Sequence, residues 1–168
     1  LLNIGNPEAL RWLTDHISGM IESEGIAIYR QDFNIDPLPF WRATDEADRQ
    51  GITEIRYIES LYAFWDELLA RHPGLIIDNC ASGGRRIDLE TTSRSIPLWR
   101  TDYHYFEPNG YQCHTYGLNF YLPCSGTGNG YPDTYAFRSS MNCAVVLGWN
   151  LYLQIFLSEF LLIQRPQG

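Results

Sequence analysis

The chain has 168 residues, of which 45% are hydrophobic and 19% charged, a composition typical of a folded protein and far from that of disordered chains. Acidic residues outnumber basic ones by 20 to 12, so the formal net charge is −8. This balance excludes the positive footprint expected of a protein that binds nucleic acid or an anionic membrane surface. A neutral or cationic ligand fits the charge better.

The cysteines and the start of the chain give little information on compartment. The four cysteines show neither a C-x-x-C pair nor the spacing of a zinc site, so we expect reduced, mostly buried thiols. His104, Cys113 and His114 lack a fourth ligand at suitable spacing, and we expect no metal. The chain begins with Leu1, which suggests a start internal to something longer, and no signal peptide opens it. Localisation is almost unreadable and leans cytoplasmic.

The first half of the chain alternates between helix and strand patterns. Residues 6–25 carry an Asn cap, a proline at the first helical position and apolar side chains at helical spacing, and they predict a helix. The run IAIYRQDF (26–33) is typical of a strand buried on both faces. Residues 53–74 predict a second amphipathic helix, which His-Pro-Gly ends.

The same alternation continues along the second half. Expected elements are strands at 75–80, 96–103, 118–124 and 143–149, and a short helix within 86–95. Short strands that alternate with helices, without hairpin signals, indicate βαβ units and a parallel α/β sheet. About five strands suit either a small doubly wound sheet or a little over half of a (β/α)8 barrel.

The apolar run 144–163 is long enough to be considered as a membrane span. Asn150, Gln154 and Glu159 interrupt it, and a buried strand followed by an apolar helix explains the same run. We therefore expect no membrane partner. Residues 1–168 are interpreted as a single domain, with 150–168 as a divergent apolar tail.

The glycine-rich segment SGTGNG (125–130) raises the alternative of a nucleotide-binding domain. It lacks both the Walker lysine and the full Rossmann spacing. A plain mobile loop is the preferred interpretation.

Three expected strands end in polar clusters: RQDFN at 30–34, DNCASGGRR at 78–86, and RTDY at 100–103. The C-terminal strand ends form the ligand face of parallel α/β folds, so these clusters are expected to converge. For any single Asp, the alternative is a helix cap or a turn residue. Three such ends in succession favour a site.

Paired Asp residues among aromatic side chains, without a metal pattern, suit glycoside hydrolysis. Arg30 would hold Asp32 ionised, whereas the aromatic neighbours Trp99, Tyr103 and Tyr105 would raise the pKa of Asp102 by desolvation. Arg100, two residues from Asp102, opposes that rise. Trp41, in the loop after Asp32, is placed to stack on a sugar.

At these residues the sequence resembles the catalytic barrel of glycoside hydrolase family 36, the bacterial α-galactosidase family related to family 27. RQDFN resembles the family motif K-W-D-x-N, which implies that Asp32 is the nucleophile. The resemblance further implies that Arg30, in place of the lysine, and Asn34 bind the sugar. An arginine keeps the charge but presents a planar fork.

Two further motifs carry the resemblance. CASGG resembles C-S-G-G-G, with Ala in place of Ser, which implies that Cys80 and Gly83 line the sugar pocket. RTDY resembles the segment that holds the acid/base, which implies this role for Asp102, with Arg100 counted among the substrate-binding residues. The resemblance runs over about residues 1–150 and implies a partial (β/α)8 barrel that lacks the family's first strands.

The resemblance implies a retaining α-galactosidase that needs no cofactor or metal. The carboxyl groups of Asp32 and Asp102 would lie about 5–6 Å apart or somewhat more. The choice between galactose and N-acetylgalactosamine stays open. The competing interpretation is a truncated barrel that binds sugar or self-assembles without turnover. In either case open sheet edges predict a homo-oligomer.

Overall fold

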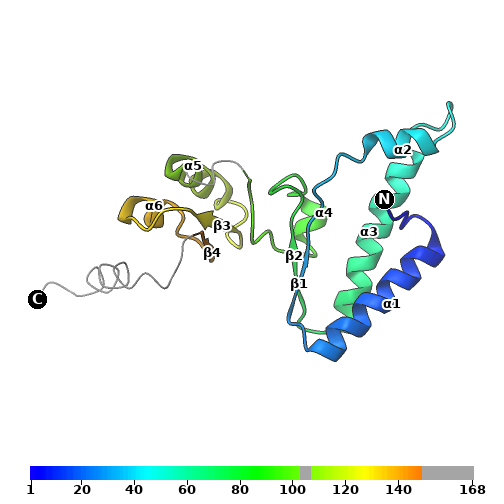
Figure 1. Cartoon of the computed structure of the whole chain (residues 1–168), viewed down its shortest axis with the longest axis horizontal. Helices are drawn as coiled ribbons and strands as arrows, with labels where there is room; N and C mark the ends of the chain where they lie inside the picture. Colours follow the sequence, from blue (N-terminus) through cyan, green and yellow to red (C-terminus); the bar gives the residue numbers. More distant parts are fainter. Residues whose placement is uncertain (103–106, 149–168) are drawn as a thin grey trace, which may run out of the picture. The chain divides into compact units, whose positions relative to one another are not determined.

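The structure is a computed structural model that describes residues 1–102 and 107–148. The chain divides into two compact units with the boundary after Pro97 (Figure 1). The interpretation of the chain as a single domain stays a prediction.

The first unit consists of helices around a pair of parallel strands. Its elements are α1 (Pro7–Glu24), β1 (Ile28–Gln31), α2 (Leu38–Thr44), α3 (Ile52–Arg71), β2 (Ile76–Asn79) and α4 (Leu89–Thr92). β1 and β2 pair in parallel, from Ile28 opposite Ile76 to Gln31 opposite Asn79. The long helices α1 and α3 lie side by side in Figure 1, and α3 connects the two strands. This is the expected βαβ unit.

Local capping explains why α1 was predictable. Asn6 caps the helix by accepting a hydrogen bond from the Glu8 N–H at 2.9 Å, and Pro7 occupies the first turn. Gly25 ends the helix with a φ of 64°, a conformation that favours glycine. The predicted helix over 6–25 is therefore confirmed.

The core of the first unit forms where α3 packs on the strands. Trp65 and Leu68 of α3 are completely buried, and Ile77 of β2 packs in the same cluster. The expectation that β1 is buried on both faces is wrong for the described residues, because Ile28 is 49% exposed.

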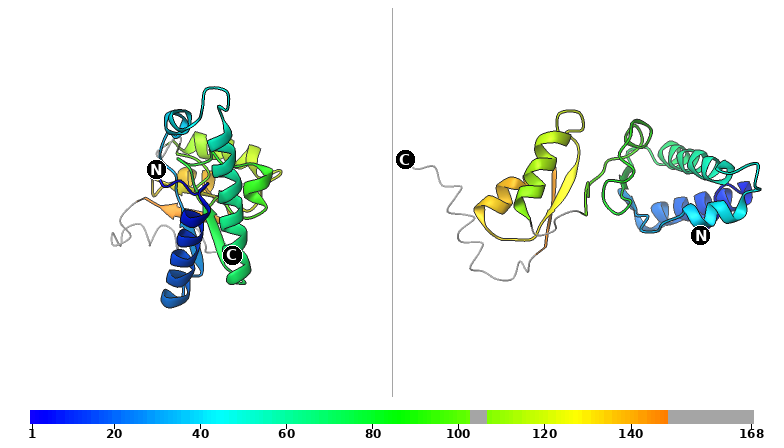
Figure 2. Two further views of the ribbon diagram at one scale, coloured as in Figure 1. Left: turned by 90° about the vertical axis from the view of Figure 1, so that its right-hand side faces the viewer. Right: turned by 90° about the horizontal axis from the view of Figure 1, so that it is seen from above.

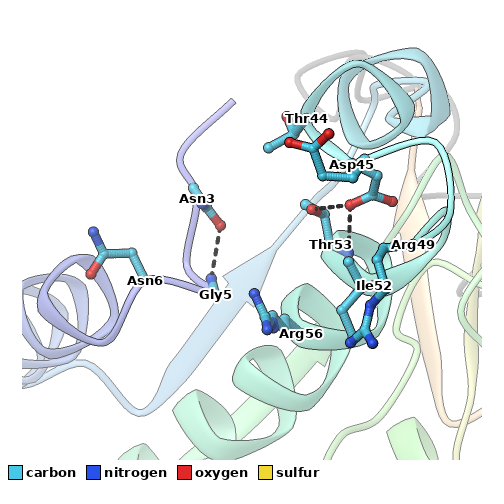
Figure 3. Close-up of a pocket in the computed structure, with 10 residues that line it drawn as sticks. Asn3, Gly5, Asn6, Thr44, Asp45, Arg49, Ile52, Thr53 and Arg56 are labelled. Carbon is cyan, nitrogen blue, oxygen red and sulfur yellow. Dashed lines mark hydrogen bonds between the residues drawn. The ribbon is translucent and has the colours of Figure 1, made fainter.

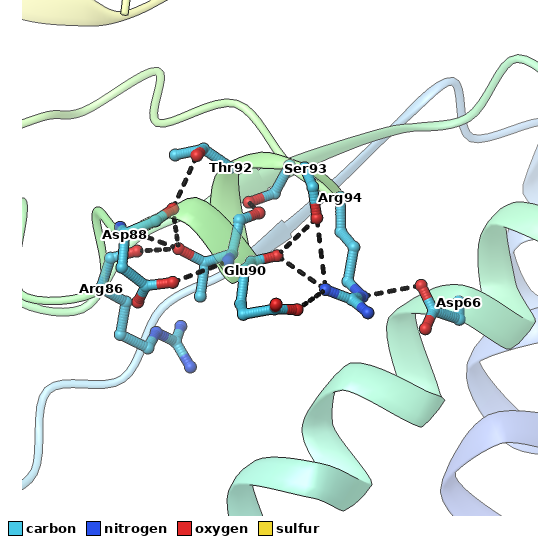
Figure 4. Close-up of polar contacts among 9 residues, drawn as sticks. Asp66, Arg86, Asp88, Glu90, Thr92, Ser93 and Arg94 are labelled. Carbon is cyan, nitrogen blue, oxygen red and sulfur yellow. Dashed lines mark hydrogen bonds and ion pairs between the residues drawn. The ribbon is translucent and has the colours of Figure 1, made fainter.

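The expected strand 96–103 is reduced to one bridge. Ile96 pairs in parallel with Asp78, and residues 97–102 form no strand. Tyr103 lies outside the described residues. The short helix expected within 86–95 is confirmed as α4, whose cap residue Asp88 accepts a hydrogen bond from the Thr91 N–H (Figure 4). Helix α2 was not predicted.

The second unit also pairs two parallel strands. Its described elements are α5 (Pro108–Leu118), β3 (Gly126–Asn129), α6 (Thr134–Ser139) and β4 (Ala144–Leu147), with α5 packed against α6 (Figure 2). β3 pairs with β4 from Gly126 opposite Ala144 to Asn129 opposite Leu147. β4 confirms the strand expected over 143–149, of which Trp149 lies outside the described residues. The strand expected at 118–124 is wrong, because residues 119–121 form a turn after α5.

β3 occupies the segment expected to be a mobile loop. All four of its residues are buried. A Cβ on Gly126 would lie 2.2 Å from the Leu98 backbone oxygen, and one on Gly128 would lie 2.4 Å from the Trp99 ring. The glycines therefore allow the close approach of the 98–99 segment to a buried strand, rather than loop motion.

Two further expectations concern the cysteines and the membrane. Cys80 is buried, but Cys113, Cys124 and Cys143 are exposed, so the expectation of mostly buried thiols is wrong. All four cysteines are free in the structure, and the reduced state stays a prediction. Across residues 1–102 and 107–148, no helix has the length and apolar character to cross a membrane. Most of the apolar run 144–163 lies outside these residues.

Candidate functional site

Asp32 lies directly after the last residue of β1 and is the central residue of the candidate site. Its side chain is 35% exposed. One carboxylate oxygen accepts a hydrogen bond from the Phe33 N–H at 2.8 Å. The other lies 3.7 Å from Nη2 of Arg30. The expected proximity of Arg30 and Asp32 is therefore present.

Residues from the turn after β2 approach the same carboxylate. The Asn34 side chain and the Cys80 thiol are the neighbouring hydrogen-bond donors that lower the pKa of Asp32 most. The N–H and the hydroxyl of Ser82 both donate to Oδ1 of Asn34 at 3.0 Å. Because its oxygen is held by Ser82, the Asn34 amide is left with its NH2 group as the donor for Asp32.

These contacts set the charge of Asp32. Partial burial alone would raise its pKa. Hydrogen bonds from Asn34, Cys80 and the N–H groups of Phe33 and Ser82 outweigh burial and lower the pKa of Asp32 below its ordinary value. Asp32 is therefore an ionised carboxylate, as a nucleophile must be.

The CASGG turn after β2, which contains Cys80, has an unusual backbone conformation with two successive positive φ angles. Ser82 has a φ of 46° and Gly83 a φ of 78°, and the Ala81 N–H donates to the Gly83 carbonyl at 3.1 Å. Only glycine adopts the conformation of Gly83 without strain. Burial raises the pKa of the Cys80 thiol and the Gly83 N–H partly offsets this, so Cys80 acts as a neutral S–H donor.

Arg30 is fixed by a buried acid on the neighbouring strand. Its Nη1 lies 2.5 Å from Oδ2 of Asp78, the residue opposite it in the β1–β2 register. The Asp78 side chain is 6% exposed, whereas that of Arg30 is 43% exposed. Burial works against the charged form, but the hydrogen bond that Arg30 donates to Asp78 raises the pKa of Arg30. Arg30 thus presents a fixed, charged fork beside Asp32.

Trp41 is not open to a ligand. It is 8% exposed and packs in the core of the first unit, with its ring 5.6 Å from that of Tyr57. The expected stacking on a sugar is corrected, because helix α2 turns the indole inward toward α3.

Arg100 is likewise buried, in the second unit. It is 3% exposed, and its guanidinium donates to the Tyr111 carbonyl at 3.2 Å and to the Thr115 hydroxyl. Burial lowers its pKa. The expected substrate contact is corrected to an internal role, in which Arg100 ties residues after Pro97 to α5.

Asp102 is exposed and belongs to the second unit. Its Oδ1 accepts a hydrogen bond from Nε1 of Trp99 at 2.7 Å, so one of the expected aromatic neighbours is present. The other two, Tyr103 and Tyr105, lie outside the described residues. The acid/base role of Asp102 stays a prediction.

Some residues around Asp32 were not singled out from the sequence. Ser82 orients Asn34, and Asp78 fixes Arg30. Arg85 donates to the Ile35 carbonyl at 3.1 Å, and Arg86 to the Cys80 carbonyl at 2.7 Å. All four residues belong to the cluster DNCASGGRR at 78–86, which was expected to converge on the site, but none of them was given a role. No group of three potential metal ligands occurs among residues 1–102 and 107–148.

A separate hollow of about 450 Å³ opens in the first unit (Figure 3). It is lined at one side by Asn3 and Asn6 and at the other by Arg49 and Arg56. Asp45, at its edge, accepts hydrogen bonds from Thr53 and the Gly51 N–H and so caps α3. None of the residues that surround Asp32 lines this hollow.

Comparison with known proteins places this geometry in a family. Residues 1–105 match the family model for Melibiase. The chain is 29% identical over 102 residues to the probable α-galactosidase C of Aspergillus flavus. The aligned residues cover 61% of the chain and 12% of that protein. It is 24% identical over 102 residues to an α-galactosidase of Lactobacillus acidophilus, covering 61% of the chain and 14% of that protein. Matches are thus fungal as well as bacterial.

Solved structures share the fold of the chain. The α-galactosidase of Lactobacillus brevis superposes with a TM-score of 0.77 at 20% identity, over 94% of this chain and 23% of that one. A variant family 36 α-galactosidase of Geobacillus stearothermophilus, in complex with stachyose, gives a TM-score of 0.77 at 18% identity, over 96% and 25%.

The match covers more than half of the chain, whereas the chain spans only 12 to 14% of the curated relatives named above. With the Asp32 cluster, the CASGG turn and the family 36 fold all present, the chain belongs to the Melibiase family of glycoside hydrolases.

Proposed function

We propose that the chain carries the nucleophile half of a retaining glycoside hydrolase that cleaves terminal α-galactosides. The observation that carries this proposal is Asp32, a strand-end carboxylate whose pKa is lowered by the hydrogen-bonding groups around it, with a direct hydrogen bond from the Phe33 N–H, and which Arg30 flanks. Names of relatives support the substrate class, since these are α-galactosidases and one solved structure holds stachyose.

The proposed reaction proceeds by double displacement. The Asp32 carboxylate attacks the anomeric carbon while the bond to the leaving oxygen breaks, and Asp102 gives its proton to that oxygen. In the second half, Asp102 takes a proton from water as the water oxygen attacks the same carbon. In the same step the bond between that carbon and Asp32 breaks, which releases the sugar with retained configuration, returns Asp32 to its carboxylate and leaves Asp102 protonated again.

The sugar-binding roles follow from the donors left open at the site. One side of the Arg30 fork is held by Asp78, so its remaining N–H groups are available for sugar hydroxyls. Asn34 bonds to Asp32 and would exchange or share this bond with a hydroxyl of the bound sugar. Cys80 is 1% exposed and Gly83 is also buried, so the expected lining of the sugar pocket is corrected to support of Asp32 from behind the proposed pocket.

The remaining parts of the proposal concern the whole protein. A partial (β/α)8 barrel, formed as a single domain that self-associates, would bring the two acids together at about 5–6 Å. Parallel β1–β2 and β3–β4 pairs and the likeness to family 36 structures support the barrel. A homo-oligomer would cover the exposed face and edge of β1.

Hydrolysis of an aryl α-galactoside by the purified chain tests the proposal. Asp32→Asn should abolish turnover, because an amide cannot form the glycosyl ester. Asp36→Asn, an exposed carboxylate four residues further along, should leave the rate unchanged. Normal turnover by Asp32→Asn would overturn the assignment of the nucleophile.

Sugar binding without turnover is the second candidate. It is favoured by the short span of the chain relative to its α-galactosidase relatives. Isothermal titration with galactose separates the two: heat of binding without release of the aryl group supports the binding function, and turnover contradicts it.

A further inference from the structure

Arg86 contacts both strand ends that form the candidate site. Its Nη2 donates to the Cys80 carbonyl at 2.7 Å and approaches the Gln31 carbonyl at 3.4 Å. Gln31 ends β1, and Cys80 directly follows β2. One guanidinium therefore ties together the C-terminal ends of two neighbouring parallel strands.

The same guanidinium lies between two aromatic rings. It is 5.6 Å from the centre of the Phe33 ring and 5.5 Å from that of Trp65. Trp65 itself donates to the Gln31 side chain at 2.7 Å. Because Gln31 precedes Asp32 and Phe33 follows it, both chain neighbours of Asp32 are held by Arg86.

The charge of Arg86 is less compensated than that of Arg30. Arg30 forms ion pairs with both Asp78 and Asp32. Arg86 takes part in none of the ion pairs found among residues 1–102 and 107–148. Burial lowers the pKa of Arg86, and the nearby Tyr57, Cys80, Asp32 and Tyr29 counter this. An arginine stays protonated in such surroundings.

Resting on the nucleophile role of Asp32 proposed above, we propose that Arg86 is a positioning residue. It fixes the backbone on both sides of Asp32 and supplies a permanent positive charge that favours the ionised carboxylate. The position and the ionised state of Asp32 would thus depend on Arg86, which does not need to contact the substrate.

Titration of Asp32 by carboxyl-carbon NMR in the full chain tests this role. The groups that face Asp32 are Arg30, Asn34, Cys80, Arg86 and the N–H groups of Phe33 and Ser82. Arg86→Met removes the charge with little change in length, and the pKa of Asp32 should rise. An unchanged pKa in a folded Arg86→Met variant would overturn the role of its charge.

Arg94→Met is the matched control. The Arg94 guanidinium also covers an aromatic ring, 4.9 Å from the centre of Tyr62, and it pairs with Asp66 and Glu90 (Figure 4). It contacts neither strand end, so its loss should leave the pKa of Asp32 unchanged. An equal rise in the pKa of Asp32 in Arg94→Met would mean that the loss of either arginine raises this pKa, and it would contradict the proposal.

Arg86→Lys keeps the test decisive if the methionine variant does not fold. Lysine keeps the charge but lacks the fork that reaches two carbonyls. The pKa of Asp32 should stay low, while the Phe33 N–H, which donates to Asp32, should exchange with solvent at least tenfold faster. Unchanged exchange would overturn the positioning role. Neither readout requires turnover, so an inactive chain would bear on the proposed hydrolysis and not on Arg86.

Discussion

Asp32 is stabilised by several neutral donors more than by one opposite charge. The main favourable contributions to its lowered pKa are hydrogen bonds from Asn34, Cys80, Phe33 and Ser82. Arg30 lies 3.7 Å away and is bound more closely to Asp78. A strand-end aspartate surrounded by donors stays ionised and keeps one side exposed to a ligand.

This environment predicts a specific dependence of stability on pH. Because the folded pKa of Asp32 lies below its ordinary value of 3.8, the stabilisation is present above pH 3.8 and is lost as pH falls through the folded value. The difference in free energy of unfolding between the wild type and Asp32→Asn should therefore shrink on acidification. Urea unfolding at a series of pH values measures it. A difference that stays constant down to the lowest pH would contradict the lowered pKa.

Sequence motifs located the residues around Asp32 but not the residues that hold them. RQDFN and CASGG contain Arg30, Asn34 and Cys80, which meet at Asp32 because parallel strands end at the same edge. The contacts of Asp78 and Arg86 depend on strand register and on side chains from α3, which no local pattern encodes. Trp41 was misplaced for the same reason, since helix α2 was not predicted.

At the scale of elements, local signals predicted the long helices and steric constraints decided the rest. Caps and apolar spacing identified α1 and α3. β3 carries no β-branched run, so its sequence resembles a loop. Its identity as a strand depends on the 98–99 segment, which leaves no space for a Cβ. Pattern reasoning has no access to such a contact between distant parts of the chain.

Substitution of these glycines tests that explanation. Gly126→Ala places a Cβ 2.2 Å from the Leu98 oxygen, and because backbone cannot easily yield, it should destabilise the second unit by about 1–3 kcal/mol or more. Gly117→Ala in α5 meets nothing within 4 Å and should be neutral or stabilising by up to about 1 kcal/mol. Urea unfolding compares the two variants. Equal stability would mean that β3 tolerates a side chain and that the glycines have another cause.

At the scale of the whole molecule, the chain belongs to one family and divides into two compact units. Residues 1–105 match Melibiase, and the boundary after Pro97 separates Asp32 from Asp102. Among residues 1–102 and 107–148, the groups that orient Asp32 all belong to the first unit. The partner acid and the barrel that would unite both are proposals that rest on the family.

The central claim is that Asp32 forms a bond to the sugar. Incubation with an activated 2-deoxy-2-fluoro-α-galactoside, which slows release of the intermediate, should release the aglycone and leave one 2-deoxy-2-fluorogalactosyl group on the chain. Mass spectrometry of the digested protein should find it on the peptide with Asp32, and should find none on Asp32→Asn. A sugar attached to any other carboxylate, or turnover of aryl α-galactosides that persists while Asp32 stays unlabelled, would contradict the account.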